Sequence, residues 1–242
     1  KSLSIHQNIL GEVHTEISDL YSDLAGIYRS QNRIKEAEKY YLKSLDIKEK
    51  LYGKEHINLV DKLNYLGGFY LHANKPKLAI KQHERALSII QAKRNSPTKQ
   101  EAITYSYLGW AYQYMGEYQK AENCYQQQYS IIKTIFGENH PEMYIVLQNI
   151  GSLNLKLSNY NNSISNFIRT INILEKYHGE DSIKLVLPLK QLASAYEQKA
   201  EYQDAEKLYK RALSIQEDSL NSSHPDIANT LVSISFFYRY YG

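Results

Sequence analysis

The sequence predicts an all-α solenoid of stacked antiparallel helix pairs. Three observations predict it: a 42-residue repeat that runs through the chain without a gap, apolar and small residues at helical spacing inside each repeat, and short polar turns between the two helices of a repeat. A single helix pair cannot bury both sides of its apolar stripe. Stacking successive pairs buries a continuous core, which makes a solenoid.

The repeat is visible as columns of similar residues that lie 42 positions apart. One column is isoleucine throughout: Ile5, Ile47, Ile89, Ile131, Ile173 and Ile215. A second column is always small: Ala25, Gly67, Gly109, Gly151, Ala193 and Ser235. A third is mostly aromatic: Tyr41, His83, Tyr125, Phe167 and Tyr209. Because a residue that recurs in every repeat usually serves the scaffold, we expect these columns to be structural.

The first helix of each repeat is predicted from the spacing of its apolar side. In the first complete repeat, the positions i, i+3, i+4 and i+7 hold Tyr21, Leu24, Ala25 and Tyr28. One side of a helix carries all four positions. A column of histidines precedes four of these helices: His14, His56, His140 and His224. Pro141 and Pro225 follow two of them, where a helix can start without the N–H that proline lacks.

The second helix follows after a short polar turn. In the first complete repeat its stripe consists of Ala37, Tyr41, Ser44, Leu45 and Ile47, and the turn before it reads QNRI. The equivalent turns read ANKP, MGEY, LSNY and KAEY, and a turn this short forces an antiparallel pair. Glycine or asparagine, which tolerate the left-handed conformation at a helix end, close the second helices: Gly11, Gly53, Asn95, Gly137, Gly179 and Asn221.

The predicted organisation is a single solenoid over residues 1–242. It comprises a half repeat at 1–13, full repeats at 14–55, 56–97, 98–139, 140–181 and 182–223, and a half repeat at 224–242. Residues 1–10 look like a second helix without its first, and residues 224–242 look like a first helix without its second. Natural arrays end in atypical polar helices, so we expect this chain to be a piece of a longer array.

Residues 189–215, LKQLASAYEQKAEYQDAEKLYKRALSI, resemble a tetratricopeptide repeat (TPR), with its leucine, leucine-small, tyrosine, alanine, aromatic and alanine in order. The 42-residue period and the His-Pro step of HPDIANTLVSISFFY (224–238) resemble the kinesin-light-chain subclass. The resemblance covers essentially the whole chain. It implies a right-handed TPR superhelix whose first helices line a concave groove. The resemblance is specific for the fold and not for a function, because such repeats occur in motor adaptors, signalling proteins and bacterial proteins.

The resemblance places the side of the first helices opposite the core in that groove. Residues on this side vary from repeat to repeat, and those in the middle are apolar or aromatic. We expect a peptide-binding groove that contains Arg29, Asn64, Leu71, Ile103, Ser106, Trp110, Tyr114, Gln148, Leu155, Lys156 and Lys190. An aromatic centre with basic flanks suits an extended peptide with an apolar anchor and acidic flanks. The alternative for Trp110 is packing against a neighbouring first helix.

Composition and charge argue against several other partners. The formal net charge is +3 and is spread along the chain, which is too weak to favour nucleic acid or an acidic membrane surface. No apolar run approaches the length of a membrane-spanning helix. A single cysteine cannot form an internal disulfide, which favours a reducing compartment such as the cytoplasm.

Nothing in the sequence has the pattern of a catalytic or metal site. The four histidines that precede helices could be interpreted as metal ligands. They occupy the same position of different repeats, however, so stacking places them apart along the edge of the solenoid. We therefore expect them to serve the loops and helix starts. Cys124 is expected to be an ordinary thiol on a helix. There is no phosphate-binding glycine-rich loop. We therefore expect no enzymatic activity, no cofactor and no metal.

We expect the chain to be a protein–protein interaction scaffold that binds a partner peptide. An alternative is a sensor or regulatory TPR array that controls an effector domain outside this sequence. Binding of single-stranded RNA would need a basic, base-stacking inner face, which is not apparent. The last helix, LVSISFFYRYY (231–241), has no second helix to cover its apolar residues, so self-association through it is expected: Leu231, Ile234, Phe236, Phe237, Tyr238, Tyr240 and Tyr241.

Overall fold

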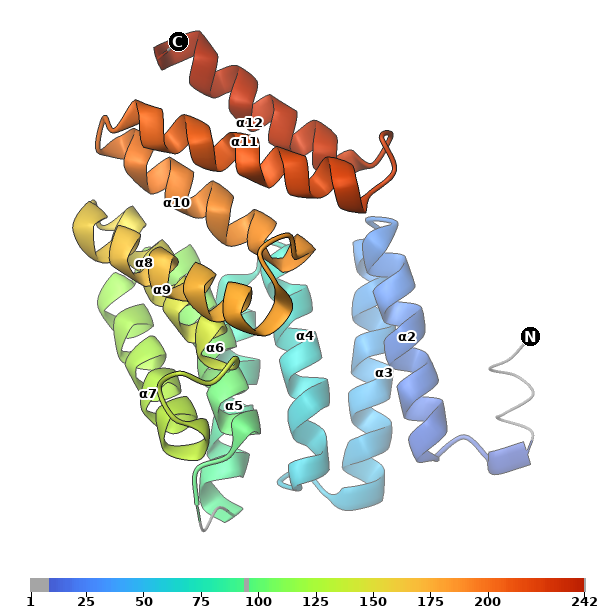
Figure 1. Cartoon of the computed structure of the whole chain (residues 1–242). Coiled ribbons are helices and arrows are strands. Elements are labelled where there is room, and N and C mark those ends of the chain that lie inside the picture. Colours follow the sequence, from blue (N-terminus) through green and yellow to red (C-terminus); the bar gives the residue numbers. More distant parts are fainter. Residues whose placement is uncertain (1–8, 94–95, 242) are drawn as a thin grey trace. The chain divides into compact units, whose positions relative to one another are not determined.

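The structure is a computed structural model that describes residues 9–93 and 96–241, and the regular elements in these residues are all helices (Figure 1). The α-helices are α2 (Thr15–Ser30), α3 (Ile34–Tyr52), α4 (Val60–His72), α5 (Pro76–Lys93), α6 (Lys99–Tyr114), α7 (Tyr118–Phe136), α8 (Met143–Lys156), α9 (Tyr160–His178), α10 (Val186–Gln198), α11 (Tyr202–Ser219) and α12 (Pro225–Tyr241). The 3₁₀ helices η1 (Ile57–Leu59) and η2 (Ile183–Leu185) precede α4 and α10. The predicted all-α fold is confirmed. The predicted half repeat at 1–13 lies mostly outside the described residues, and so does the helix end predicted at Asn95.

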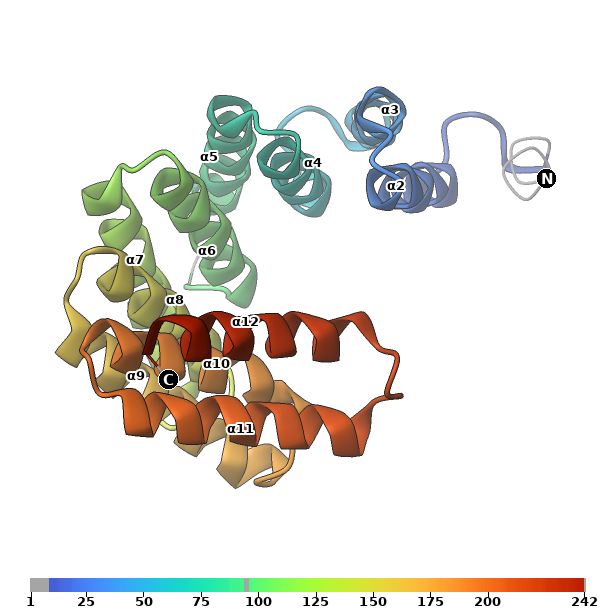
Figure 2. The ribbon, with the colours of Figure 1, turned by 90° about the horizontal axis from the view of Figure 1, so that it is seen from above.

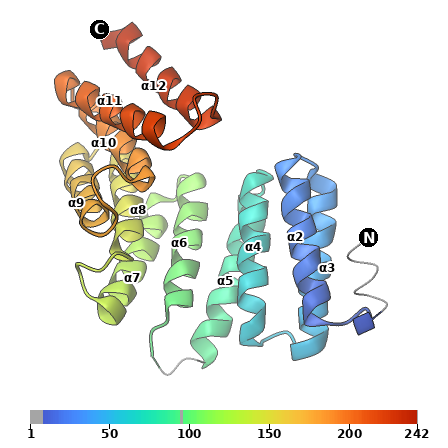
Figure 3. The same cartoon turned by 45° about the vertical axis from the view of Figure 1, so that its right-hand side comes forward.

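The chain forms two compact units, residues 1–131 and 132–242. In the first unit α2 packs on α3, α4 packs on α5, and α5 packs on α6. Seen from above, α2, α4 and α6 lie in one row, and α3 and α5 lie in a second row (Figure 2). In the second unit each helix from α8 to α12 packs on the next (Figure 3). Each unit is thus a stack of antiparallel helix pairs, as the periodicity predicts.

The turns inside the helix pairs use a left-handed residue at the same position of each repeat. These residues are Asn32 (φ 57°), Asn74 (φ 56°), Gly116 (φ 76°), Ser158 (φ 60°) and Ala200 (φ 61°). A left-handed residue lets the chain reverse directly after a helix and satisfies its last carbonyl groups. The predicted tight turns are confirmed, although only one of them uses glycine.

The column of small residues is explained by the aromatic column of the second helices. A Cβ atom added at Gly67 would overlap the ring of His83. One at Gly151 would lie 2.8 Å from the ring of Phe167, which is closer than real Cβ atoms approach. The two helices of a pair therefore come together by setting a ring directly on the backbone of the first helix.

Each histidine of the column caps the segment in which a first helix begins: α2 after His14, η1 after His56, the turn before α8 after His140, and α12 after His224. The Nδ1 atom of each of these histidines accepts a hydrogen bond of 3.2 Å from the backbone N–H two residues later, in His14, His56, His140 and His224. The predicted role at helix starts is confirmed. The sequence predicted a helix start at Pro141, two residues before α8 begins at Met143. The backbone first forms hydrogen bonds that span three residues, from Met143 N to His140 O and from Tyr144 N to Pro141 O. At the other end of a pair, α11 stops at Ser219, short of Asn221.

Each unit has its own apolar core. The first is centred on Leu59, Leu63, Leu66, Phe69 and Ile90, which are essentially inaccessible to solvent. The second is centred on Phe167, Leu174, Leu185 and Leu189. No helix in the described part of the chain is both long enough and apolar enough to span a bilayer.

Candidate functional site

The predicted groove residues are divided between the two units. The first unit holds Arg29 on α2, Asn64 and Leu71 on α4, and Ile103, Ser106, Trp110 and Tyr114 on α6. The second unit holds Gln148, Leu155 and Lys156 on α8 and Lys190 on α10. The predicted residues of each unit are therefore described separately.

One side of α6 exposes large apolar and aromatic side chains. Ile103, Trp110 and Tyr114 are 40%, 49% and 59% exposed, and Tyr107 lies between them at the same helical spacing. The neighbouring helix α4 adds Tyr65, which is 52% exposed. We call these five residues the aromatic face. Exposed aromatic side chains gathered on one surface are typical of binding sites.

Hydrogen bonds and ring contacts hold the aromatic face in place. The ring of Tyr107 stacks on buried His83 at 5.4 Å and meets the edge of Trp110 at 6.1 Å. The hydroxyl of Tyr114 donates a hydrogen bond of 2.9 Å to Asn74, in the turn that follows α4. Because the rings are already restrained, they would lose little conformational entropy when a ligand binds.

Charge around the aromatic face is mixed. Burial raises the pKa of the Tyr107 hydroxyl, and the neighbouring Tyr65 and Asp61 raise it further while Arg29 lowers it. Tyr107 is therefore a neutral hydrogen-bond donor at physiological pH. Arg29 is exposed and close enough to act on Tyr107, whereas Asp61 already accepts a hydrogen bond of 2.9 Å from Gln100.

Two predicted groove residues are buried, contrary to the expectation. Asn64 is 5% exposed and Ser106 is 7% exposed. The amide of Asn64 donates to Thr104 at 2.9 Å, and its carbonyl oxygen accepts from His83 at 2.9 Å. A helical wheel treats the helix as isolated, but α4 and α6 pack together along this column. Asn64 therefore links neighbouring repeats and is not available to a peptide.

Leu71 and Leu155 also differ from the expectation, since both pack against the cores of their units. The same column in other repeats holds partners for the aromatic residue of the second helix. Tyr125 donates a hydrogen bond of 2.9 Å to Gln113. This column therefore lies at the edge of the helix pair, where a leucine contributes mainly to packing.

In the second unit the predicted residues take part in contacts between repeats. Gln148 donates to Gln191 at 2.8 Å, and Lys190 donates to Thr230 at 3.2 Å. Burial lowers the pKa of Lys190, and Asp226 opposes this change. Lys156 is exposed. Of the predicted cations, Arg29 and Lys156 are thus the more accessible.

Sequence reasoning missed Tyr65 and Tyr107 as members of the exposed surface. Their column also contains Asp23 and Gln191, so its residue type changes from repeat to repeat in the way expected of a binding surface. That variability was the available signal. At this column the wheel selected Asn64 and Ser106, which are buried, one position before Tyr65 and Tyr107. Ile103, Trp110 and Tyr114, selected in the same way, are exposed.

Two kinds of reactive site can be examined in the described residues, a metal site and a reactive thiol. These residues contain no group of three His, Cys, Asp or Glu side chains that could hold a metal ion. Burial, with a contribution from Glu84, raises the pKa of the Cys124 thiol to about 12, so the thiolate needed of a nucleophile is not formed at neutral pH.

Comparisons with known proteins identify the repeat. The family model described as tetratricopeptide repeat matches residues 1–50, 16–92, 58–134, 100–161 and 142–218. A search of curated proteins gives no match.

Among solved structures, BtubC (BKLC) from P. vanneervenii is 20% identical with a TM-score of 0.73, over 93% of this chain and 87% of that chain. A putative kinesin light chain from Podospora anserina with nearly identical TPR-like repeats is 19% identical with a TM-score of 0.69, over 86% and 99%. A Rap protein complexed with Competence and Sporulation Factor is 15% identical with a TM-score of 0.69, over 86% and 54%. Likeness at these identities shows a shared fold.

Proposed function

Because the chain belongs to the tetratricopeptide repeat family, we propose that it is a protein–protein interaction scaffold that binds a peptide segment of a partner on its aromatic face. The observation that carries the proposal is the exposure of Tyr65, Ile103, Trp110 and Tyr114 on two adjacent first helices. Such a surface would gain free energy by being covered, and Trp and Tyr are the residues that most often dominate binding.

The partner segment is extended and carries an apolar or aromatic side chain that packs beside Trp110. Phenol hydroxyls at its border supply hydrogen bonds, and Arg29 meets an acidic residue next to the anchor. The predicted cations Lys156 and Lys190 belong to the second unit, so the proposed site on the first unit does not include them.

One structural neighbour supports a binding role for this fold. The Rap protein was solved in a complex with Competence and Sporulation Factor. The fold of the present chain is therefore one that can hold another molecule. In this chain the exposed side chains of the aromatic face support that surface as the binding site.

The proposal is tested by selecting peptides on the chain from a random display library and measuring their affinities for variants. Trp110→Ala should weaken binding of the selected peptides about 30-fold, because a central aromatic residue commonly contributes about 2 kcal/mol when truncated. Tyr177→Ala is the matched control. Tyr177 is 46% exposed and lies on α9, the second helix of its repeat, so its substitution should leave the affinity unchanged. Selected peptides that bind Trp110→Ala as tightly as the parent would place the site elsewhere.

A further inference from the structure

A second surface, formed by α3 and α5, carries a regular array of lysines. Lys35, Lys39 and Lys43 are four residues apart on α3, and Lys77 and Lys81 occupy equivalent positions on α5. Residues four apart lie on one side of a helix, and all five are exposed. We call these five residues the lysine face. The equivalent positions of the next second helix, α7, are neutral: Gln119, Asn123 and Gln127.

The carboxylates around the lysine face are mostly engaged by other side chains. Their ion pairs are Glu36 with Arg33, Glu38 with Lys75, Asp46 with Lys50, and Glu49 with Arg85. Glu84 accepts a hydrogen bond from Tyr112. No carboxylate of the described residues lies within ion-pair distance of any lysine of the lysine face. The five lysines of the lysine face therefore form no ion pair within the unit.

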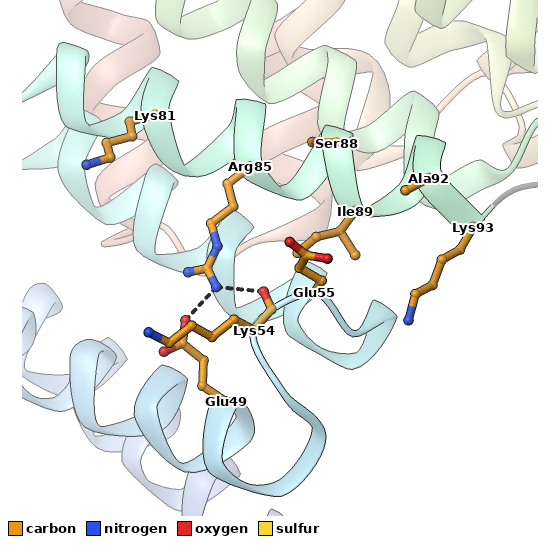
Figure 4. A pocket seen from close by; sticks show the side chains of 9 residues that line it. All are labelled: Glu49, Lys54, Glu55, Lys81, Arg85, Ser88, Ile89, Ala92 and Lys93. Carbon is orange, nitrogen blue, oxygen red and sulfur yellow. Dashed lines mark hydrogen bonds and ion pairs between the residues drawn. The ribbon is translucent and has the colours of Figure 1, made fainter.

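Two ion pairs connect α3 with α5 and with the turn that precedes α5. Lys75 contacts Glu38 at 2.9 Å, and Arg85 contacts Glu49 at 2.6 Å. Arg85 also donates to the backbone carbonyl of Lys54 at 2.7 Å. Beside this contact lies an open pocket of about 680 Å³, with Lys81 at one end and Lys93 at the other (Figure 4). The charged residues that line the pocket are the cations Lys54, Lys81, Arg85 and Lys93 and the carboxylates Glu49 and Glu55. Because the cations outnumber the carboxylates, the pocket extends the positive surface along α5.

Exposed leucines lie among the lysines. Leu42 on α3 is 45% exposed, and Leu78 on α5 is 40% exposed. A partner for this surface therefore has apolar side chains as well as negative charge. Nucleic acid fits less well, because single-stranded bases stack on open aromatic rings. The ring of Tyr40, which lies beside Lys39 and Lys43, is already stacked on Tyr21 and Tyr28.

We propose that the lysine face binds an acidic segment of a partner protein, in which carboxylates alternate with leucine-like side chains. The proposal rests on charge complementarity. The lysines have no carboxylate partner and occupy equivalent positions on α3 and α5. They therefore attract a segment that carries negative side chains at a matching spacing. This surface is independent of the aromatic face, so the chain can engage a partner at two places.

The probe is a fluorescein-labelled peptide that alternates glutamates with leucines, and the reference is the same peptide with glutamine in place of glutamate. The double variant Lys39→Glu/Lys81→Glu should bind the acidic peptide at least about tenfold more weakly, because it replaces attraction by repulsion. The glutamine peptide should bind weakly to both proteins. Raising the salt from about 50 mM to about 0.5 M should remove most of the difference.

The matched control is Lys176→Glu/Lys207→Glu, which changes the net charge equally at exposed lysines of the second unit. It should retain parental affinity, as should Trp110→Ala. Circular dichroism confirms that each variant is folded. Equal loss in both double variants would overturn the proposal, because net charge would then explain the binding. Tighter binding of a single-stranded oligothymidylate that depends on Lys39 and Lys81 would also overturn it, in favour of nucleic acid.

Discussion

His83 is a fully buried titratable side chain with only one ring nitrogen hydrogen-bonded. Its Nδ1 atom lies 2.9 Å from the carbonyl oxygen of Asn64 and must donate, since that oxygen can only accept. Its Nε2 atom has no partner among the described residues. In the next repeat the equivalent Tyr125 finds an acceptor in Gln113, but Leu71 occupies that place beside His83. The site therefore holds a neutral imidazole.

The first prediction concerns the pH dependence of stability. Burial lowers the pKa of His83 to about 4, from about 6.5 in an unfolded chain. Below pH 6.5 the unfolded chain takes up a proton that the folded chain cannot yet accept, so stability decreases as the pH falls. Between pH 7 and pH 5 the loss should be about 2 kcal/mol in the free energy of unfolding. Urea denaturation at each pH measures it.

The control for this effect is His83→Phe, which follows the ring type that Phe167 supplies in another repeat. The variant is expected to be less stable overall, because it leaves the carbonyl oxygen of Asn64 without its donor. Its stability should nevertheless change less between pH 7 and pH 5 than that of the parent. An identical slope in the two proteins would show that His83 titrates normally in the fold.

Individual residues were predictable from the sequence when their role depends on local geometry. A histidine before a helix caps that helix wherever the helix packs, so its column could be interpreted correctly. Asn64 and Ser106 were placed wrongly, because their burial depends on the approach of α4 to α6. A wheel of one helix contains no information about its neighbours.

Helix capping by histidine is a property of the element and gives the second prediction. His14 accepts from the N–H of Glu16 and begins α2. His14→Ala removes this bond and should lower the free energy of unfolding by about 1 kcal/mol. His14→Asn keeps an acceptor at the cap and should restore most of the loss. Chemical denaturation of the three proteins decides the matter, and equal stability of all three would show that the cap contributes nothing.

Helix pairs and their turns were predictable because the same residue pattern recurs in five full repeats. The exact starts of the helices were less predictable. The 3₁₀ helices η1 and η2 precede α4 and α10, and α8 begins after a turn at Pro141. These starts depend on individual backbone hydrogen bonds. The division into repeats at the stated boundaries, and the right-handed superhelix, stay predictions.

The last helix, α12, has one side packed on the unit and other residues left exposed. One side of α12 packs on α11, where Phe237 lies 5.8 Å from Tyr209 and is buried, so its predicted exposure was wrong. Ile234 is half-buried in the same contact. Four further large apolar or aromatic residues of α12 are exposed: Leu231, Val232, Phe236 and Tyr240. Tyr238 and Tyr241 are also partly exposed, although they contact Glu206 and Tyr202 of α11. An exposed patch of this kind promotes association.

The third prediction is that this chain self-associates through α12. Light scattering should show an apparent mass that rises with concentration, and Phe236→Ser/Tyr240→Ser should reduce the rise. The control Tyr177→Ser/Ile183→Ser removes similarly exposed residues elsewhere and should not change it. A parent chain that remains monomeric at high concentration would contradict the prediction.

Surfaces were less predictable than the core at the scale of the whole chain. The composition shows a modest net charge of +3. It does not show that the lysines of two helices lack carboxylate partners, or that most nearby carboxylates are paired with other cations. Which charges pair depends on how α3 and α5 lie together. The aromatic face likewise combines Tyr65 with residues of another helix.

The central claim is that a partner peptide covers the aromatic face, and the fluorescence of Trp110 tests it most directly. Trp110 is the sole tryptophan of the chain, so its emission reports this surface alone. Titrating a selected peptide that lacks tryptophan should shift the emission to shorter wavelength, because burial removes water from the indole. The shift should saturate together with binding measured by calorimetry. Tight binding by calorimetry with unchanged emission would contradict the account.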